Sequence, residues 1–573
     1  MKTKNFNLKS NEQGMALVIV LMVVMVFAIL GSAFIARTVN EKNTADRERL
    51  LNQAFYLAEA GADAGLNKLD ELINTDLLNT VNSQNPNILG NKAQQYATTN
   101  NGLGFLIEFV KKAGVAQLTL SGTQASYTLN NTALGAGTYS FDVVLSQKSN
   151  PIFVTTDMWD FPYFYQIQSR SNVQNTSRKV RLDGDITVRV QRDNFAKYAL
   201  FTDHHGMPNG DTVWFTTQTD FAGPLHTNSR YSFAFNPAGN FEGAVTQQNN
   251  NARFYNNGFP FLADASQNGV VDVPVFNSTY TRGVSQIVLA SSVQQADLAD
   301  QAKGGQNINS AGIHVPNSAG SVVGGIFIKG SPDITLGVDG SNNAKYTIQL
   351  GGTTKVITVD RMSNTTSVVT NAGAPVTYTG LPEGTDKLGT IIYTDGTVNK
   401  LQGTVQGDTE ITISSQFDIN IVNHIKYQNY TPAVGTPGTV GYVPPNAAGE
   451  TNLLGLVAWG GNVNIATTAP NNIEMHGIVM ARNGIFQVNN YNDTGPGSRG
   501  VATLLGGVIT QFYGAFGLFD ASTGNLISGF GRNSVYDDRT LLGKTPPYFP
   551  SMRTFIAFTN DLTDKVSYQE GGF

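Results

Sequence analysis

Six histidines and no cysteine are available for metal or nucleophilic chemistry in this chain of 573 residues. The densest group is Asp203-His204-His205, with Asp211 and His226 further along. Adjacent histidines on a strand point to opposite faces, so both could bind one metal only from a turn. We therefore predict no metal site and interpret the group as a hydrogen-bonded turn.

Acidic residues elsewhere do not form a recognisable catalytic pattern. Asp339-Gly340-Ser341-Asn342-Asn343 offers oxygen ligands but lacks the closing Glu of an EF-hand loop, which leaves a calcium site in such loops open. Asp537-Asp538 precedes Arg539 in a pattern typical of a solvated turn. Phosphate-binding, dinucleotide-binding, G-x-S-x-G and H-E-x-x-H motifs are missing. The sequence thus predicts no enzyme, no catalytic residue and no cofactor. A polysaccharide hydrolase or lyase with carboxylates from distant positions stays an alternative.

Composition narrows the class of protein. Charged residues make up 14% of the chain and the net charge is −5, which argues against nucleic acid as a partner because binding needs a basic face. Sixty glycines and many short β-branched runs indicate strands joined by turns. Apolar residues at 40% exclude a disordered chain.

Near the N-terminus lies one long apolar run, which would anchor the rest of the chain. Residues 15–35 read MALVIVLMVVMVFAILGSAFI and carry no charge, enough for a helix of about 30 Å, the thickness of a bilayer core. This run exceeds the apolar core of a cleaved secretory signal, and a basic leader ending in Gln13-Gly14 precedes it. The sequence therefore predicts a helix that stays attached to the mature protein.

This N-terminus resembles that of type IV pilin-like proteins. The closest resemblance is to minor pilins of the PilX kind and to K-class pseudopilins of type II secretion. The matching residues are 14–21 (GMALVIVL) and 57–61 (LAEAG). The resemblance implies that a prepilin peptidase removes leader 1–14 by cutting after Gly14, so that Met15 becomes the new N-terminus. Most major pilins carry Glu five residues after the cut, whereas this chain has Ile19.

The resemblance also implies location and partners. Residues 15–35 would lie in the bacterial inner membrane or in a filament core, against other pilin-like subunits, with the remainder periplasmic or extracellular. The residues expected in this helix are Leu17, Val18, Ile19, Leu21, Val24, Phe27, Leu30 and Ile35.

Further along, the pattern changes from helix to strand. Residues 36–80 continue the helix, and one apolar face is formed by Leu51, Phe55, Ala58, Ala62, Leu66, Leu69 and Ile73. Residues 81–102 indicate a linker. Residues 103–192 predict a short helix near 103–112 and then a small antiparallel sheet on the amphipathic helix, as in small pilins. Asp183-Gly184 signals either a hairpin or a point inside one long strand.

Residues 193–573 are predicted to form one large Gly/Asn-rich β domain, and an internal repeat appears within it. Apolar runs between glycines begin at Gly325, Gly389, Gly455, Gly477 and Gly507. Intervals of 22 and 30 residues separate the last three, which suits one coil of a β-solenoid. A β-sandwich with glycine-rich turns is the alternative.

Two stretches of this region resemble a large uncharacterised bacterial β-rich domain that follows pilin-type leaders. They are 198–228 with FEGAV at 241–245, and 531–550. This second resemblance supports the architecture and says nothing about chemistry. We therefore expect a minor pilin or pseudopilin-like subunit of a type IV pilus or type II secretion-like machine. The alternative is an adhesin that binds surface glycans or host surfaces.

Overall fold

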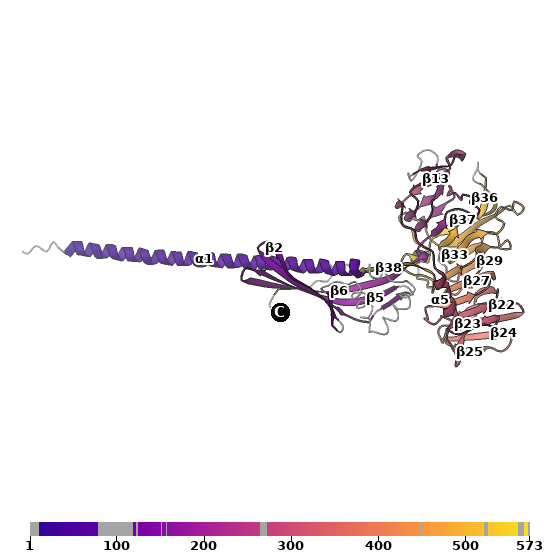
Figure 1. Ribbon diagram of the computed structural model, residues 1–573, viewed down its shortest axis with the longest axis horizontal. Coiled ribbons are helices and arrows are strands. Elements are labelled where there is room, and N and C mark those ends of the chain that lie inside the picture. The colour runs from indigo at the N-terminus through magenta and orange to yellow at the C-terminus, as the bar shows by residue number, and fades with distance from the viewer. Residues whose placement is uncertain are drawn as a thin grey trace, which may run out of the picture.

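The computed structural model describes residues 11–77, 118–121, 124–150, 152–155, 158–263, 272–446, 449–520, 525–559 and 567–570. One very long helix carries a small antiparallel sheet along its second half, and a large body of stacked β-coils lies across the helix axis (Figure 1). The chain is therefore mainly β with a long N-terminal helix, as predicted. The predicted linker 81–102 and the helix near 103–112 lie outside the described residues.

Helix α1 (Asn11–Glu71) is continuous and passes into one π-helical turn, η1 (Leu72–Leu77). It contains no proline, so nothing in its sequence interrupts the hydrogen-bond ladder. The predicted apolar face is confirmed: Ala58, Ala62, Leu69 and Ile73 are buried, and Leu51, Phe55 and Leu66 are half-buried.

The small sheet is antiparallel and packs on that face, as expected. Its central hairpin joins the two longest strands through a turn at Gln174, where φ is 54°. Asp183-Gly184 lies inside β6, so the alternative of one long strand is the correct one. The strands are β1 (Leu118–Ser121), β2 (Gln124–Leu134), β3 (Gly137–Gln147), β4 (Ile152–Thr155), β5 (Met158–Val173) and β6 (Thr176–Asn194).

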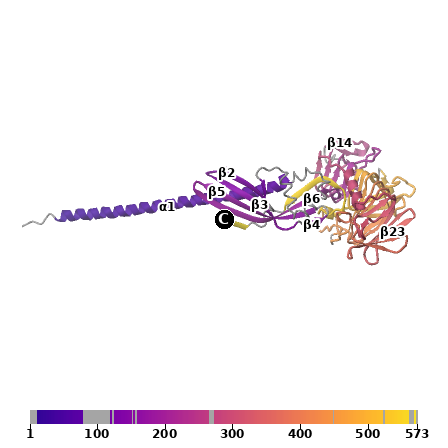
Figure 2. The ribbon, with the colours of Figure 1, turned by 60° about the horizontal axis from the view of Figure 1, so that its bottom comes forward.

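Two further strands of this sheet come from the C-terminus. Both β38 (Ser551–Thr559) and β39 (Ser567–Glu570) pair antiparallel with β6. Figure 2 shows β6 reaching from the small sheet toward the large body. The prediction that 193–573 form one domain is therefore wrong at its C-terminal end, because the chain returns to the small sheet.

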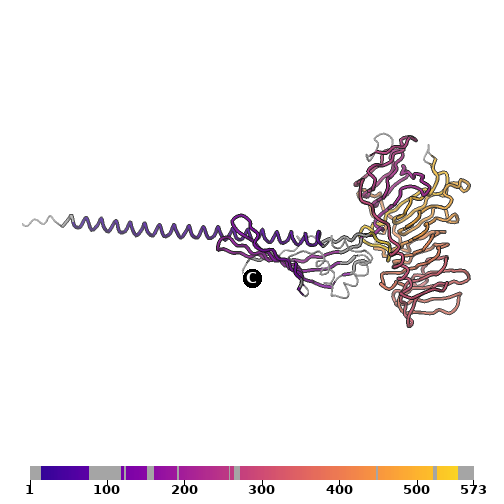
Figure 3. Tube along the Cα trace, in the orientation of Figure 1, coloured from indigo at the N-terminus to yellow at the C-terminus, as the bar shows by residue number. Residues whose placement is uncertain are grey.

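The large body contains two parallel sheets. The strand pairings of the two sheets form one closed path, as they would in a barrel. The strands of successive coils pair in parallel, however, so the body is a solenoid of stacked coils (Figure 3). This confirms the solenoid over the sandwich. The first sheet contains β7 (Leu200–His204), β9 (Leu225–Thr227), β12 (Val245–Gln247), β16 (Tyr280–Arg282), β20 (Ile326–Lys329), β26 (Thr390–Thr394), β28 (Glu410–Ser415), β30 (Leu453–Ala458), β33 (Ile478–Val488) and β35 (Val508–Phe512).

The five predicted repeats are strands β20, β26, β30, β33 and β35 of this sheet. They follow one another in space in the predicted order, with β28 inserted between β26 and β30. The sequence missed β28 because Thr409, rather than glycine, precedes it.

The order of coils differs from the order of the sequence. The chain enters the stack at β7 and proceeds outward through β9 and β12 to β16. It then continues through helix α5 (Ser292–Lys303) to the opposite end and returns from β20 to β35, which pairs with β7. The last coil of the solenoid therefore lies on the first, and we call this contact the seam.

The second sheet forms the opposite wall of the solenoid. Between the two walls lies a core of mostly Ile, Leu and Val side chains. The strands of this wall are β21 (Asp333–Val338), β27 (Val398–Val405), β29 (Ile419–Tyr427), β31 (Val463–Ile465), β32 (Glu474–His476), β34 (Ser498–Leu505), β36 (Gly517–Phe519) and β37 (Leu526–Val535).

Shorter elements complete the two ends. At one end lie β17 (Gly312–His314), β18 (Asn317–Ser318), β19 (Ser321–Val322), β22 (Ala344–Leu350), β23 (Thr353–Asp360), β24 (Thr365–Thr370) and β25 (Val376–Thr379). The other end holds β8 (Asp220–Phe221), β10 (Ser232–Phe233), β11 (Asn240–Phe241), β13 (Ala252–Phe254), β14 (Phe261–Ala263) and β15 (Val275–Phe276), around an aromatic core. The short 3₁₀ turns are η2 (Phe195–Lys197), η3 (Asn256–Gly258) and η4 (Asp538–Thr540).

The outer face of the first sheet is also covered. Helix α5 packs on it through Leu298 and Ala302, and the segment before β38 adds Tyr548 and Phe549. Strands buried on both faces need apolar residues at nearly every position, which explains the continuous runs in the repeats.

Candidate functional site

The exposed half of α1 is the most distinctive surface of the molecule. Every residue from Gly14 to Ala45 is exposed, including Phe27 at 69% and Ile35 at 67%. The most apolar 18-residue window has a mean hydropathy of 3.0, and none of it is buried. The helix is therefore long and apolar enough to cross a membrane. An apolar surface of this extent is typical of contact with lipid or with other chains.

All the predicted residues of the membrane helix lie on this surface. They are Leu17, Val18, Ile19, Leu21, Val24, Phe27, Leu30 and Ile35. Gly14 lies in the first turn of α1, one residue before Met15, and a Cβ built on Gly14 would meet no atom within 4 Å. A side chain at Gly14 would therefore leave the packing of the fold unchanged.

The structure separates the two adjacent histidines. His205 is buried, with ring centroids 4.6 Å from Phe215 and 4.8 Å from Tyr513. Burial, assisted by the positive charge of Arg532, lowers the pKa of His205 to about 3, so this ring is neutral. His204 is exposed and its Nε2 lies 3.3 Å from Asp203. The two rings therefore lie in different surroundings: His204 is the last residue of β7, and His205 lies in the bend that follows the strand.

His226 is held by neighbouring polar side chains. Its Nδ1 lies 2.8 Å from the Thr246 hydroxyl and its Nε2 lies 2.9 Å from the Asn228 side-chain oxygen. The Asn228 amide in turn donates to Asp203 at 2.8 Å. Within the described part of the chain, no three His, Asp or Glu side chains are grouped to hold a metal ion. These residues form a hydrogen-bonded framework between neighbouring coils.

Asp339 serves the turn between β21 and β22. Its Oδ1 accepts backbone N–H groups from Ser341 at 2.9 Å and from Asn343 at 2.8 Å. The hydrogen bond from the Asn343 backbone is the main cause of the lowered pKa of this carboxyl. The Asp339 carboxylate is therefore used within the turn, while the Asn342 side-chain oxygen accepts from the Gln428 amide at 2.7 Å.

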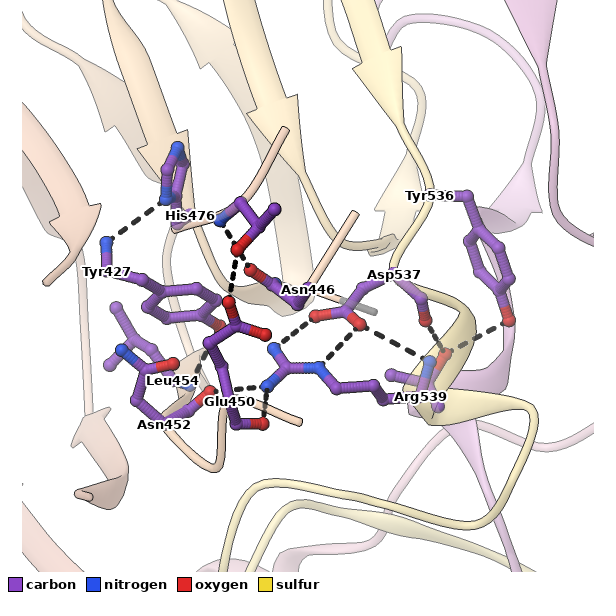
Figure 4. Close-up of polar contacts among 11 residues, drawn as sticks. Tyr427, Asn446, Glu450, Asn452, Leu454, His476, Tyr536, Asp537 and Arg539 are labelled. Atoms are coloured by element: carbon purple, nitrogen blue, oxygen red, sulfur yellow. Dashed lines mark hydrogen bonds and ion pairs between the residues drawn. The ribbon is translucent and has the colours of Figure 1, made fainter. Parts of the chain in front are cut away.

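The Asp537-Arg539 segment contradicts the expected solvated turn. Asp537 is 1% exposed and Arg539 is 8% exposed (Figure 4). Arg539 donates from Nε to Asp537 Oδ1 at 2.8 Å and from Nη2 to Oδ2 at 2.6 Å. Its Nη1 donates to the backbone oxygens of Glu450 at 2.8 Å and of Asn452 at 3.0 Å. The pair thus ties the segment after β37 to the loop before β30.

A second set of buried polar contacts lies beside this pair. The backbone N–H of Tyr427 donates to His476 Nδ1 at 3.0 Å, and the Tyr427 hydroxyl accepts from Leu454 N–H at 3.1 Å (Figure 4). Burial lowers the pKa of His476 to about 4. Arg539 occupies the Asp537 carboxylate, and a backbone N–H occupies Nδ1 of His476. This network therefore fits a structural clamp better than a general acid–base pair.

Sequence reasoning missed this clamp and the aromatic end of the solenoid. An Asp-Asp-Arg triplet reads the same whether or not other coils cover it. The aromatic end had a signal in the density of Phe, Tyr and Trp between residues 214 and 255.

Comparison with known families gives a match to part of the chain. The model of a domain of unknown function (DUF4900) matches residues 160–249. The match begins in β5, covers β6 and ends after β12, so it crosses from the small sheet into the first three coils of the solenoid. No curated protein and no solved structure matches this chain.

Proposed function

We propose that the protein is a minor pilin or pseudopilin-like subunit of a type IV pilus or type II secretion-like machine. The first half of α1 would be held in the inner membrane and the solenoid would be displayed on its outer side. A prepilin peptidase and other pilin-like subunits would be its partners. Its role would be structural, in assembly or in contact with a surface.

The continuity of α1 is the observation that supports this proposal best. One helix carries a fully exposed apolar half and then, without interruption, a half that packs under an antiparallel sheet. A signal peptide that is removed from the mature protein is not expected to continue as one helix into the folded part of the chain. Gly61 and Gly65 let the helix approach the sheet, because a Cβ there would lie 2.3 Å from the Ser169 hydroxyl and 2.6 Å from Ile167.

Two features favour a minor subunit at a tip or initiating position. The solenoid lies across the helix axis and is far broader than the small sheet, which would obstruct close packing at every position of a filament (Figure 1). The second feature is Ile19, where major pilins carry Glu. A lone carboxylate at membrane depth costs about 2.5 to 3.5 kcal/mol on insertion scales and persists only beside a partner. The first subunit of a filament has no subunit beyond it whose N-terminal amine could pair with such a carboxylate. Ile19 at this position avoids the cost of an unpaired charge.

The mature N-terminus tests the proposal directly. Mass spectrometry of the membrane-bound protein should find a chain that begins at Met15 and retains the apolar helix. Gly14→Ala should leave the leader attached, because the change adds a side chain at the cut and disturbs no packing. Gly31→Ala is the matched control, since a Cβ there also meets no atom within 4 Å. A mature chain that starts beyond Ile35 would exclude the proposal.

The minor position has its own measurement. Quantitative proteomics of sheared surface filaments should find this chain at a small fraction of the principal pilin. Equal abundance would contradict the tip or initiating position while leaving the anchoring intact.

A further inference from the structure

Two adjoining hollows open at the aromatic end of the solenoid. The smaller has a volume of about 180 Å³ and the larger about 670 Å³. They share the lining residues Trp214, Thr216, Gln218, Tyr255 and Phe519. The smaller hollow also contains Phe235, so four aromatic side chains wall it. We call Trp214, Phe235, Tyr255 and Phe519 the aromatic box.

The rings of the box present faces in different directions. Trp214 and Tyr255 have centroids 5.4 Å apart with planes at 74°, and Phe235 and Tyr255 have centroids 6.0 Å apart at 50°. Phe519 is 41% exposed at the end of β36. Each aromatic face carries negative potential from its quadrupole, so non-parallel rings around one hollow suit a compact cation.

A buried carboxylate fixes two walls of the box. Asp272 is fully buried, and its Oδ1 accepts the backbone N–H of Phe235 at 2.8 Å while its Oδ2 accepts that of Asn256 at 2.5 Å. Asn256 directly follows Tyr255. Phe235 has a φ of 75°, a left-handed conformation that is costly for a bulky side chain and needs support from its surroundings. The box is therefore preorganised rather than formed by free surface rings.

The charges that line the two hollows are mainly negative. Asp520 lines the smaller hollow, and Asp211 and Asp220 line the larger. Among the described residues that line these hollows, the one lysine or arginine is Arg532, which donates to the Gly514 backbone oxygen at 3.0 Å and lies 4.0 Å over the ring of Phe516. Its guanidinium is thus occupied within the protein, and the balance of charge opposes an anionic ligand.

We propose that the aromatic box binds a quaternary alkylammonium group, of the kind found in choline. The methyl groups of such a cation fill an apolar hollow, and its charge, spread over those methyls, is attracted to the ring faces and to the acidic rim. The site joins the first coils of the solenoid to Phe519 near the C-terminus, so it exists only when the seam is closed. This proposal does not depend on how the N-terminal helix is anchored.

Choline and its neutral isostere 3,3-dimethylbutan-1-ol test the role of charge. The full chain is placed in nanodiscs of phosphatidylglycerol, which has no choline head group, and ligand saturation is followed by saturation-transfer NMR. Choline should bind roughly tenfold or more tightly than the isostere, because cation–π attraction in a desolvated site is worth about one decade or more. Equal binding of the two would overturn the proposal.

Variants locate the binding site. Trp214→Ala and Phe519→Ala should each remove choline binding, and Trp214→Phe should retain part of it because a ring remains. Phe417→Ala is the control, since Phe417 is similarly exposed at 47% and lies outside both hollows. Circular dichroism of each variant establishes that it is folded. Choline binding that survives in folded Trp214→Ala and Phe519→Ala would overturn the assignment.

Two further probes identify the ligand class. Cosedimentation with phosphatidylcholine vesicles, compared with phosphatidylglycerol vesicles, distinguishes a lipid head group from a soluble or polymer-borne choline; choline-dependent binding from either source supports the site. Cellohexaose is the neutral polysaccharide probe. Cellohexaose binding that Trp214→Ala abolishes, without binding of choline, would replace the proposal with a glycan site.

Discussion

A Cβ built on Gly507 would lie 2.1 Å from the carbonyl oxygen of Tyr198. These two residues lie at the seam, where the backbone N–H of Val508 donates to the carbonyl oxygen of Ala199 at 3.1 Å. The strand that ends the return path of the solenoid is thus hydrogen-bonded to the strand that begins its outward path. Contacts of such sequence separation make the solenoid dependent on its C-terminal coil.

Gly507→Ala should weaken the seam. The added methyl group would meet backbone rather than the flexible end of a side chain, so strands β7 and β35 must separate. Overpacking of this kind costs about 1 to 3 kcal/mol. Urea unfolding of the full chain, followed by intrinsic fluorescence, measures the loss. Gly352→Ala is the control, because a Cβ there meets no atom within 4 Å; similar losses in both variants would refute a special role for the seam.

The seam shows where sequence reasoning ends. Glycine-bounded apolar runs predicted five strands and their order correctly, because each strand buried on both faces leaves a local signature. No local pattern predicts that Gly507 lies against Tyr198 in the neighbouring coil. That contact arises because the chain passes through α5 to the opposite end of the solenoid before it returns. The return of β38 to the small sheet was missed for the same reason. The long helix α1 and its apolar face were predictable because the periodicity of a helix is a local pattern in the sequence.

The candidate sites divide in the same way. Gly14 and the exposed helix follow from the order of residues alone. The clamp around Arg539 and the box around Trp214 bring together residues from separate coils, so only the fold reveals them.

His205 should make stability depend on pH. Its folded pKa of about 3 lies below the ordinary value of 6.5, so between these values the unfolded chain binds more protons and stability rises with pH. The contribution is fully present above pH 6.5 and falls as the pH is lowered, by about 2 kcal/mol at pH 5. His205→Phe should remove this term, which unfolding measured at pH 7 and pH 5 would detect. Equal pH dependence in the His205→Phe variant and in the unmodified chain would contradict this assignment.

Gly65 should control how the helix docks on the sheet. Ala favours a helix over Gly by about 1 kcal/mol, but its Cβ would lie 2.6 Å from Ile167, and overpacking costs about 1 to 3 kcal/mol. The second effect is larger, so Gly65→Ala should destabilise the protein and expose the small sheet to protease. Asn67→Ala, at an exposed position of the same helix, should instead be neutral or slightly stabilising. A stabilised Gly65→Ala variant would show that the contact relaxes freely.

The buried pair of Asp537 and Arg539 should behave as one unit. Arg539→Met leaves the Asp537 carboxylate buried without its cation, and Asp537→Asn leaves the guanidinium buried without its anion. Each single change should cost about 3 to 5 kcal/mol. Asn can still cap η4, so its cost reports the lost charge rather than a lost helix cap.

The double variant decides whether the two losses are coupled. With both charges removed no buried ion is left unpaired, so the Asp537→Asn, Arg539→Met protein should be more stable than the sum of the single losses predicts. Urea unfolding of the four proteins gives the coupling energy. The more exposed pair of Lys400 and Asp333, 2.8 Å apart, provides the comparison: Lys400→Met should cost less than about 1 kcal/mol. Additive losses at Asp537 and Arg539 would mean that the hydrogen bonds from Arg539 to the Glu450 and Asn452 carbonyls, rather than the ion pair, hold the two segments together.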